Sequence, residues 1–319
     1  MRTRLLTALL ASVVLLGLLL VAADLERRAT ADAVGEVFAD LSWPLVLLAF
    51  ALYAGSYGGR ALRLAALLPG APAFGRLCSV SARHNLLNLV LPFRSGEASL
   101  PLMLKAEAGR PLAEGVAALL VARVLDLLCV TSYFLLGGAL RAGGGQDAHA
   151  PRVALVLAGV LCALVVMRPG ARWLARATLS EGRVGGFVQR LAGHVGTVGT
   201  RRLAGATAVS FLTWGLTYAA CYALVLAMAG PGPVGTALAR VSVADSLVGS
   251  SLLHLTAILP INTIAGAGAW EAGWTAGYVL AGVDEIAAFA SAVGSHVLIF
   301  AFIALLGGLA FLRRRGTRA

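Results

Sequence analysis

Charged side chains are scarce in this sequence: they make up 13% of 319 residues, and only 15 residues are acidic. An ordinary soluble domain carries about 25% charged residues. Hydrophobic residues instead make up 59% of the chain, and the mean hydropathy is +0.85. A water-soluble fold has no core large enough to bury so much apolar surface. The sequence therefore predicts an all-α polytopic protein of the cell membrane.

Cysteine is also scarce, and the motifs of common enzyme classes are missing. Cys78, Cys129, Cys162 and Cys221 lie in apolar segments, and none has a second cysteine nearby, as a metal knuckle requires. The chain contains no GxxxxGK[ST] phosphate loop, no GxSxG elbow and no cluster with metal-ligand spacing. We expect buried, unreactive thiols, no metal and no cofactor, and no catalytic residue can be assigned. Enzymatic activity is left without support.

Six apolar segments are interpreted as full transmembrane helices, since about 20 helical residues cross about 30 Å of hydrocarbon. The first has small residues, Val21-Ala22-Ala23, at its end and is also compatible with a cleaved signal peptide, although its length favours a retained helix. The six segments are 5–23, 44–68, 111–140, 153–167, 203–229 and 286–312.

Two further apolar segments are interrupted by proline. The first runs over 77–91, stops at Pro92, and continues after Gly96 as a short helix to Lys105. The second runs over 241–259, stops at Pro260, and resumes over 266–281. Because proline disrupts a helix interior, both are interpreted as Pro-broken hairpins. Whether they re-enter on one side or span fully is left open.

Positive charge is distributed unevenly among the loops. Under this topology nineteen of the 26 Lys and Arg residues, Arg60 and Arg63 included, are cytoplasmic and five are external. Basic loops mark the cytoplasmic side, so both termini are predicted to be cytoplasmic. The segment 168–202 has seven arginines and one acid, and its part 172–196 is predicted to be cytoplasmic and partly amphipathic. Since the arginines lie in short loops, no nucleic-acid partner is expected.

The predicted segments form one transmembrane domain, 1–319, with two similar halves. Each half, 1–150 and 151–319, contains a span, a second span, a Pro-broken hairpin and a third span. The first half starts inside and the second starts outside, so the halves form an inverted repeat. Transporter folds often have this organisation, with interrupted helices meeting around the substrate.

Polar residues surround the first break. Asn85 and Asn88 precede it, and Arg94 and Glu97 follow it. A charge at mid-membrane costs about 2.5–3.5 kcal/mol, so it normally faces a cavity or a partner. An arginine there suits phosphate recognition, because its planar guanidinium makes two parallel hydrogen bonds. Arg94 and Glu97 are alternatively paired with each other, sealing the turn.

Arg123 and Asp126 are three residues apart in an apolar span, and therefore lie on one helix face. A structural ion pair and a functional role explain this spacing equally well.

Small residues and one acid follow the second break. Asn262 lies in the break itself, Gly266 and Gly268 follow, and Glu271 comes next. The glycines permit a close approach of a head group or of another helix, and the sequence does not decide between them. Glu271 needs a proton, a partner or water, which favours a functional role.

His254, His296 and Asp245 are isolated in apolar context. Each is interpreted as bonded to a neighbouring helix rather than as part of a site.

Three motifs resemble one known family. The stretch 85–97 contains Pro92-Phe93-Arg94-Ser95-Gly96-Glu97, residues 121–126 contain Ala122-Arg123-Val124-Leu125-Asp126, and residues 266–271 end in Trp270-Glu271. The lysylphosphatidylglycerol synthase/flippase transmembrane-domain family is similar, with a Pro-x-Arg-x-Gly-Glu turn, a [Glu/Ala]-Arg-x-x-Asp helix and a later Gly-rich turn. Trp270 departs from that family's pattern, in which a basic residue is commoner.

The resemblance implies a lipid-translocating module that moves a phospho-, aminoacylated or glycosylated lipid between leaflets. Its soluble aminoacyl-transferase domain has no counterpart in the sequence, so lipid aminoacylation by this chain alone is not expected. The implied partners are membrane lipids, an anionic or head-group-modified phospholipid above all, with a homodimer or a separate lipid-modifying enzyme as further partners. A membrane-embedded transferase acting on a lipid-linked substrate, and a non-catalytic partner of a lipid-modifying enzyme, remain as alternatives.

Overall fold

A computed structural model describes residues 27–68, 70–141, 169–173, 176, 183–258 and 264–316. Within these ranges every regular element is a helix. Predicted spans 5–23 and 153–167, together with Cys162, Pro260 and Asn262, lie outside the described residues.

Four helices are long and apolar enough to cross a membrane, among the residues described. They match four of the six predicted spans, and the all-α polytopic membrane class is confirmed. Large apolar side chains on their outer faces are exposed, including Leu47, Leu120, Leu212 and Leu305, as expected where lipid is the solvent. The four helices are α3 (Trp43–Leu67), α6 (Leu112–Arg141), α9 (Thr200–Ala227) and α13 (Glu285–Gly316).

Helices flank both predicted breaks. The first hairpin consists of α4 (Phe74–Val90), the 3-10 segment η1 (Pro92–Ala98) and α5 (Ser99–Ala108). The second consists of α11 (Val243–Ile258), the short η2 (Ile264–Gly266) and α12 (Ala269–Leu280). Ala265, Gly266 and Gly268 have positive φ angles of 58°, 78° and 81°, which reverse the chain before α12.

Three shorter helices are α2 (Arg27–Ala39), α8 (Arg183–Thr197) and α10 (Pro233–Ala239), and residues 169–173 are also helical. The sequence had suggested no helix at α2 or α10. The apolar side of α8 packs against α6 through Ala192 and Val195, with Leu191 beside them. Part of the apolar side of α8 therefore contacts protein, and the cytoplasmic, partly amphipathic character of 172–196 stays a prediction. Trp173, before α8, is exposed.

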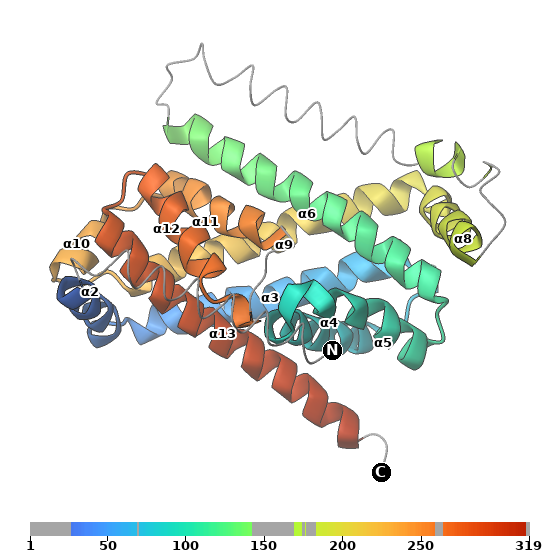
Figure 1. The fold of residues 1–319 in the computed structure, drawn as a ribbon, viewed down its shortest axis with the longest axis horizontal. Helices are drawn as coiled ribbons and strands as arrows, with labels where there is room; N and C mark the ends of the chain where they lie inside the picture. The colour runs from blue at the N-terminus through green and yellow to red at the C-terminus, as the bar shows by residue number, and fades with distance from the viewer. Residues whose placement is uncertain are drawn as a thin grey trace.

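Corresponding helices of the two halves make corresponding contacts. α3 packs along α9 at the centre, α4 packs on α13, and α11 packs on α6. In Figure 1 the α4–α5 and α11–α12 hairpins lie towards opposite ends of the bundle, between α6 and α13. Each hairpin therefore contacts the last long helix of the other half. Equivalent contacts of this kind are expected of two halves related by an inverted repeat, and the repeat itself stays a prediction.

Small residues allow the close helix contacts. A Cβ atom on Gly277 of α12 would collide with the carbonyl oxygen of Gly249 in α11. A Cβ on Gly137 of α6 would lie 2.9 Å from Ala244 O at the start of α11. Such close approaches increase the van der Waals contact between helices. This contact matters in a membrane, because the hydrophobic effect does not drive helices together in lipid. The two helices of the second hairpin are held together, and α11 is held against α6, in this way.

Candidate functional site

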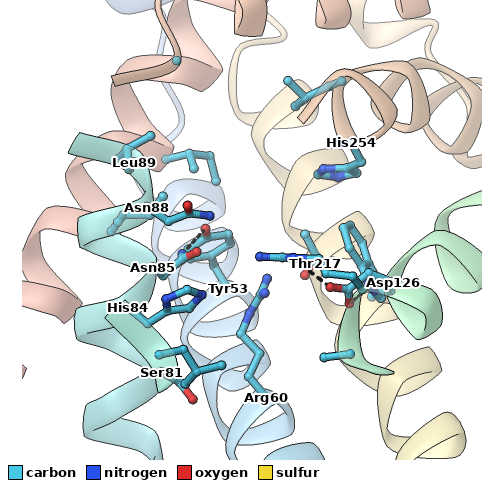
Figure 2. Close-up of a pocket in the computed structure, with 18 of the residues that line it drawn as sticks. Tyr53, Arg60, Ser81, His84, Asn85, Asn88, Leu89, Asp126, Thr217 and His254 are labelled. Carbon is cyan, nitrogen blue, oxygen red and sulfur yellow. Dashed lines mark hydrogen bonds and ion pairs between the residues drawn. The ribbon is translucent and has the colours of Figure 1, made fainter. Parts of the chain in front are cut away.

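A cavity of about 200 Å³ lies inside the bundle, between the two hairpins. All four long helices contribute to its wall, as do both hairpins. The polar and aromatic residues lining it are Tyr53, Arg60, Arg63, Ser81, His84, Asn85, Asn88, Arg123, Asp126, Trp214, Thr217, His254, Thr256 and Trp270. Apolar residues such as Leu89, Leu253 and Ile299 fill the rest of the wall. Figure 2 shows the polar side chains facing one another across this space.

Asp126 is the hub of the charges in the cavity wall. It is the fifteenth residue of the 30-residue α6 and is only 1% exposed. Its Oδ1 accepts hydrogen bonds from Arg63 Nη1 at 2.5 Å and from Trp214 Nε1 at 2.8 Å. Its Oδ2 accepts one from Arg123 Nη1 at 3.0 Å. Helices α3, α6 and α9 are thus joined through one buried carboxylate.

Glu97 brings the first hairpin to the same network. Its Oε1 accepts from Arg123 Nη2 at 2.6 Å, and its Oε2 accepts from Arg123 Nε at 3.3 Å. Such a forked pair is among the stronger hydrogen-bonded arrangements. Gly96 makes it possible, since a Cβ there would lie 2.5 Å from Leu87 O on α4. The turn therefore packs flat on α4 and directs Glu97 towards α6.

The α4 wall is polar along one face. Asn85 donates to Tyr57 OH at 2.7 Å, and Asn88 donates to Glu97 Oε1 at 3.5 Å. His84 Nδ1 lies 2.8 Å from Ser99 Oγ at the start of α5. These bonds link α4 to α3 and to the rest of its own hairpin, so the wall is positioned by bonds at several points.

The second turn forms a separate cluster beside the cavity. Glu271 Oε1 lies 2.6 Å from His296 Nδ1, and Glu271 Oε2 accepts from Gly268 N at 2.7 Å. His296 Nε2 lies 2.9 Å from Ala265 O, and Trp270 stacks on the imidazole ring with centroids 5.1 Å apart. Both ring nitrogens face acceptors, so His296 donates from both only as the imidazolium. Glu271 and His296 then form an ion pair that closes the turn.

The structure brings several predicted site residues together. Asn85, Asn88, Arg123 and Asp126 line the cavity, and Glu97 binds Arg123. The Arg123–Asp126 ion pair is present, within a larger network than the spacing suggested.

Gly266 also lines the cavity, whereas Glu271 does not and bonds to His296 beside it. Pro92 and Arg94 belong to η1, and their side chains, like Pro260 and Asn262 as a whole, lie outside the described residues.

Three arginines that the sequence placed in cytoplasmic loops have buried positions within the bundle. Arg63 is 5% exposed, and both Arg60 and Arg63 line the cavity. Arg83 is likewise buried and paired with Glu107 at 2.6 Å. Their assignment to the cytoplasmic side stays a prediction.

The isolated polar residues also have partners. His254 meets the rings of Trp214 and Tyr218, at centroid distances of 4.8 and 5.3 Å. Asp245 pairs with Arg141 at 2.9 Å.

Sequence reasoning missed most of the cavity wall, including Arg60, Arg63, Trp214 and His254. Arg60 and Arg63 are three residues apart in an apolar segment, the same signal that had singled out Arg123 and Asp126.

The polar and charged side chains of the cavity wall can recognise a polar group. In the part of the chain that the structure describes, no three His, Cys, Asp or Glu side chains come together as metal ligands would. Cys129 and Cys221 are buried free thiols, as expected, and Cys78 is partly buried.

Comparison with known proteins agrees with the motifs. Residues 6–307 match the family described as "Lysylphosphatidylglycerol synthase TM region". A comparison with curated proteins finds no match. The matched segment includes every residue of the cavity, and the resemblance first noted around Pro92 and Arg123 is confirmed.

Proposed function

The chain belongs to the family of the lysylphosphatidylglycerol synthase transmembrane region, and from this premise we propose that it moves a polar-headed lipid between the leaflets of the cell membrane. It is a multi-pass membrane protein of a lipid-related family. Movement of the lipid, its head group and a cytoplasmic position of both termini are parts of the proposal.

The observation that carries the proposal is a charged cavity inside an apolar helix bundle. The cavity has a volume of about 200 Å³ and a wall that carries Arg60, Arg63, Arg123 and Asp126. We infer that the head group occupies this space while the acyl chains remain in lipid. A translocating protein needs such a site, because a charged head group otherwise has to enter hydrocarbon without partners.

The packing of the hairpins supports a transport mechanism. Each hairpin contacts the last long helix of the opposite half, α4 on α13 and α11 on α6. In inverted-repeat transporters, one unit rocks against the other around a central site. We infer that α4–α5 and α11–α12 act in this way and open the cavity alternately to each leaflet.

The ion pairs of the proposed site allow Arg123 to exchange a carboxylate partner for a lipid phosphate. Arg123 is shared between Glu97 on the first hairpin and Asp126 on α6. A lipid phosphate that enters can replace Glu97 as a partner of Arg123, which frees the hairpin to move. Arg94 is a second candidate of this kind from the sequence alone.

Two measurements test the function. Mass spectrometry of lipid retained through gentle purification should identify a phospholipid, and proteoliposomes should exchange a labelled phospholipid between leaflets faster than protein-free vesicles. Arg94→Ala and Glu97→Gln should each slow this exchange. Unchanged exchange in both variants would remove these residues from the site, and a covalently altered lipid in producing cells would point to a transferase instead.

A further inference from the structure

Unpartnered polar atoms are concentrated in the cavity. Six buried side-chain polar atoms have no hydrogen-bond partner in the described part of the chain, and five belong to residues that line this space. An unpaired buried polar group is expensive, so this concentration indicates a polar occupant. The five atoms are Arg60 Nε, Arg63 Nε, Ser81 Oγ, Asn88 Oδ1 and His254 Nε2.

Arg60 differs from the other two arginines of the network. Arg63 and Arg123 both bind Asp126, and Arg123 also binds Glu97. Arg60 makes no ion pair or hydrogen bond with a described residue, and its guanidinium lies 5.9 Å from the centre of the Tyr57 ring. Among the described side chains, the site therefore holds three guanidinium groups and two carboxylates, with Arg60 as the excess cation.

The surroundings of Arg60 suit an oxyanion. Figure 2 shows its side chain rising from α3 into the middle of the cavity, with His254 across the space and Asn85 and Asn88 on one flank. Arg60 Nε and His254 Nε2 can both donate to oxygen, and a guanidinium matches phosphate geometry. Asn88 Oδ1, the one atom of the five that only accepts, suits a hydroxyl or ammonium group beside the anion.

We propose that this cavity is a phosphate seat in which Arg60 is the direct charged ligand, His254 is a second donor and Asn88 accepts from a donor on the same head group. The inference deepens the proposed function, on which its lipid source rests. The phosphate chemistry is shared by a phospholipid and by free inorganic phosphate. Arg63, already neutralised by Asp126, serves to position the wall, and Arg123 becomes a further ligand only when the phosphate displaces Glu97 from it.

Binding to the full-length protein in detergent tests the seat without any transport step. The probes are short-chain phosphatidylglycerol, the matching diacylglycerol without phosphate, and inorganic phosphate. The wild type should bind the phospholipid and not the diacylglycerol. Arg60→Gln should raise the apparent Kd by about tenfold or more, the range for a lost charged hydrogen bond. Arg60→Lys, which keeps the charge, should restore part of this loss.

Arg76→Gln is the matched control, because Arg76 is exposed and contacts only the carbonyl of Glu107 through a hydrogen bond of 3.3 Å. It should bind as the wild type does. Thermal unfolding without ligand identifies variants that fail to fold. His254→Gln is a second variant of the phosphate seat, and we expect it to raise the Kd for the phospholipid as well.

The outcomes test the phosphate seat and the proposed lipid transport separately. Equal Kd values for wild type, Arg60→Gln and His254→Gln, or equal binding of the diacylglycerol, would overturn the seat, even if lipid exchange is observed. Arg60-dependent binding of the phospholipid supports it with a lipid source. Arg60-dependent binding of inorganic phosphate alone supports it with a free anion, and contradicts the lipid function.

Discussion

Arg63 Nη1 on α3 donates a hydrogen bond to Asp126 Oδ1 on α6 at 2.5 Å, with side-chain exposures of 7% and 2%. The two residues are 63 positions apart in the sequence, and their ion pair joins two long helices. Removing one member of a buried pair leaves the other without compensation, at a cost of about 3–5 kcal/mol. We expect Asp126→Asn to lower the free energy of unfolding by about 3 kcal/mol or more, because two arginines then lose their carboxylate.

Unfolding in detergent, followed by circular dichroism against added denaturing detergent, measures this loss. Asp32→Asn on the exposed side of α2 is the control and should change stability by less than about 0.5 kcal/mol. Adding Arg63→Gln to Asp126→Asn should cost less than Arg63→Gln costs alone. Additive losses would mean that the two side chains do not interact.

A second prediction concerns the turn of the first hairpin. Gly96→Ala should lower stability by about 1–3 kcal/mol, because a Cβ there would lie 2.6 Å from the backbone nitrogen of Asn88 and neither backbone can yield without moving η1. Gly75→Ala in the same hairpin meets nothing within 4 Å and should leave stability unchanged or raise it by up to about 1 kcal/mol. Equal effects of the two substitutions in thermal unfolding would contradict the packing described for η1.

A third prediction separates turn closure from lipid binding. Glu271→Gln should lower stability by about 1–3 kcal/mol, since it removes the counter-charge of His296 and weakens the bond from His296 to Ala265 O. Phospholipid binding should stay within about twofold of wild type once protein amounts are matched by folded fraction. A tenfold loss of binding with unchanged unfolding would instead assign Glu271 to the head-group site, as the sequence alone had suggested.

The four described spans were predictable because each is a continuous apolar segment of sufficient length, a property that needs no tertiary information. The break at Pro92 and the shared face of Arg123 and Asp126 followed from local geometry in the same way. Helix α10 was also within reach, since Pro233 at its first turn is a favourable helix start, although no helix was predicted there.

Long-range pairing was beyond the sequence. Arg63 and Arg123 converge on Asp126 only because α3, α6 and α9 pack together, and neither spacing nor composition indicates which helices meet. His296 looked isolated for the same reason, although its partner Glu271 is 25 residues away. The place of Arg60 in the cavity wall was hidden by its position near the end of a span, where a basic residue ordinarily marks the cytoplasmic side.

Lipid exchange in proteoliposomes tests the central claim most directly. A phospholipid with a fluorescent head group is placed in both leaflets, and a membrane-impermeant quencher reports the rate at which inner-leaflet lipid reaches the outside. We expect wild type and Arg76→Gln to exchange at equal rates above that of protein-free vesicles, and Arg60→Gln and Glu97→Gln to be slower by about tenfold at equal amounts of folded protein. A wild-type rate equal to that of protein-free vesicles would contradict the account.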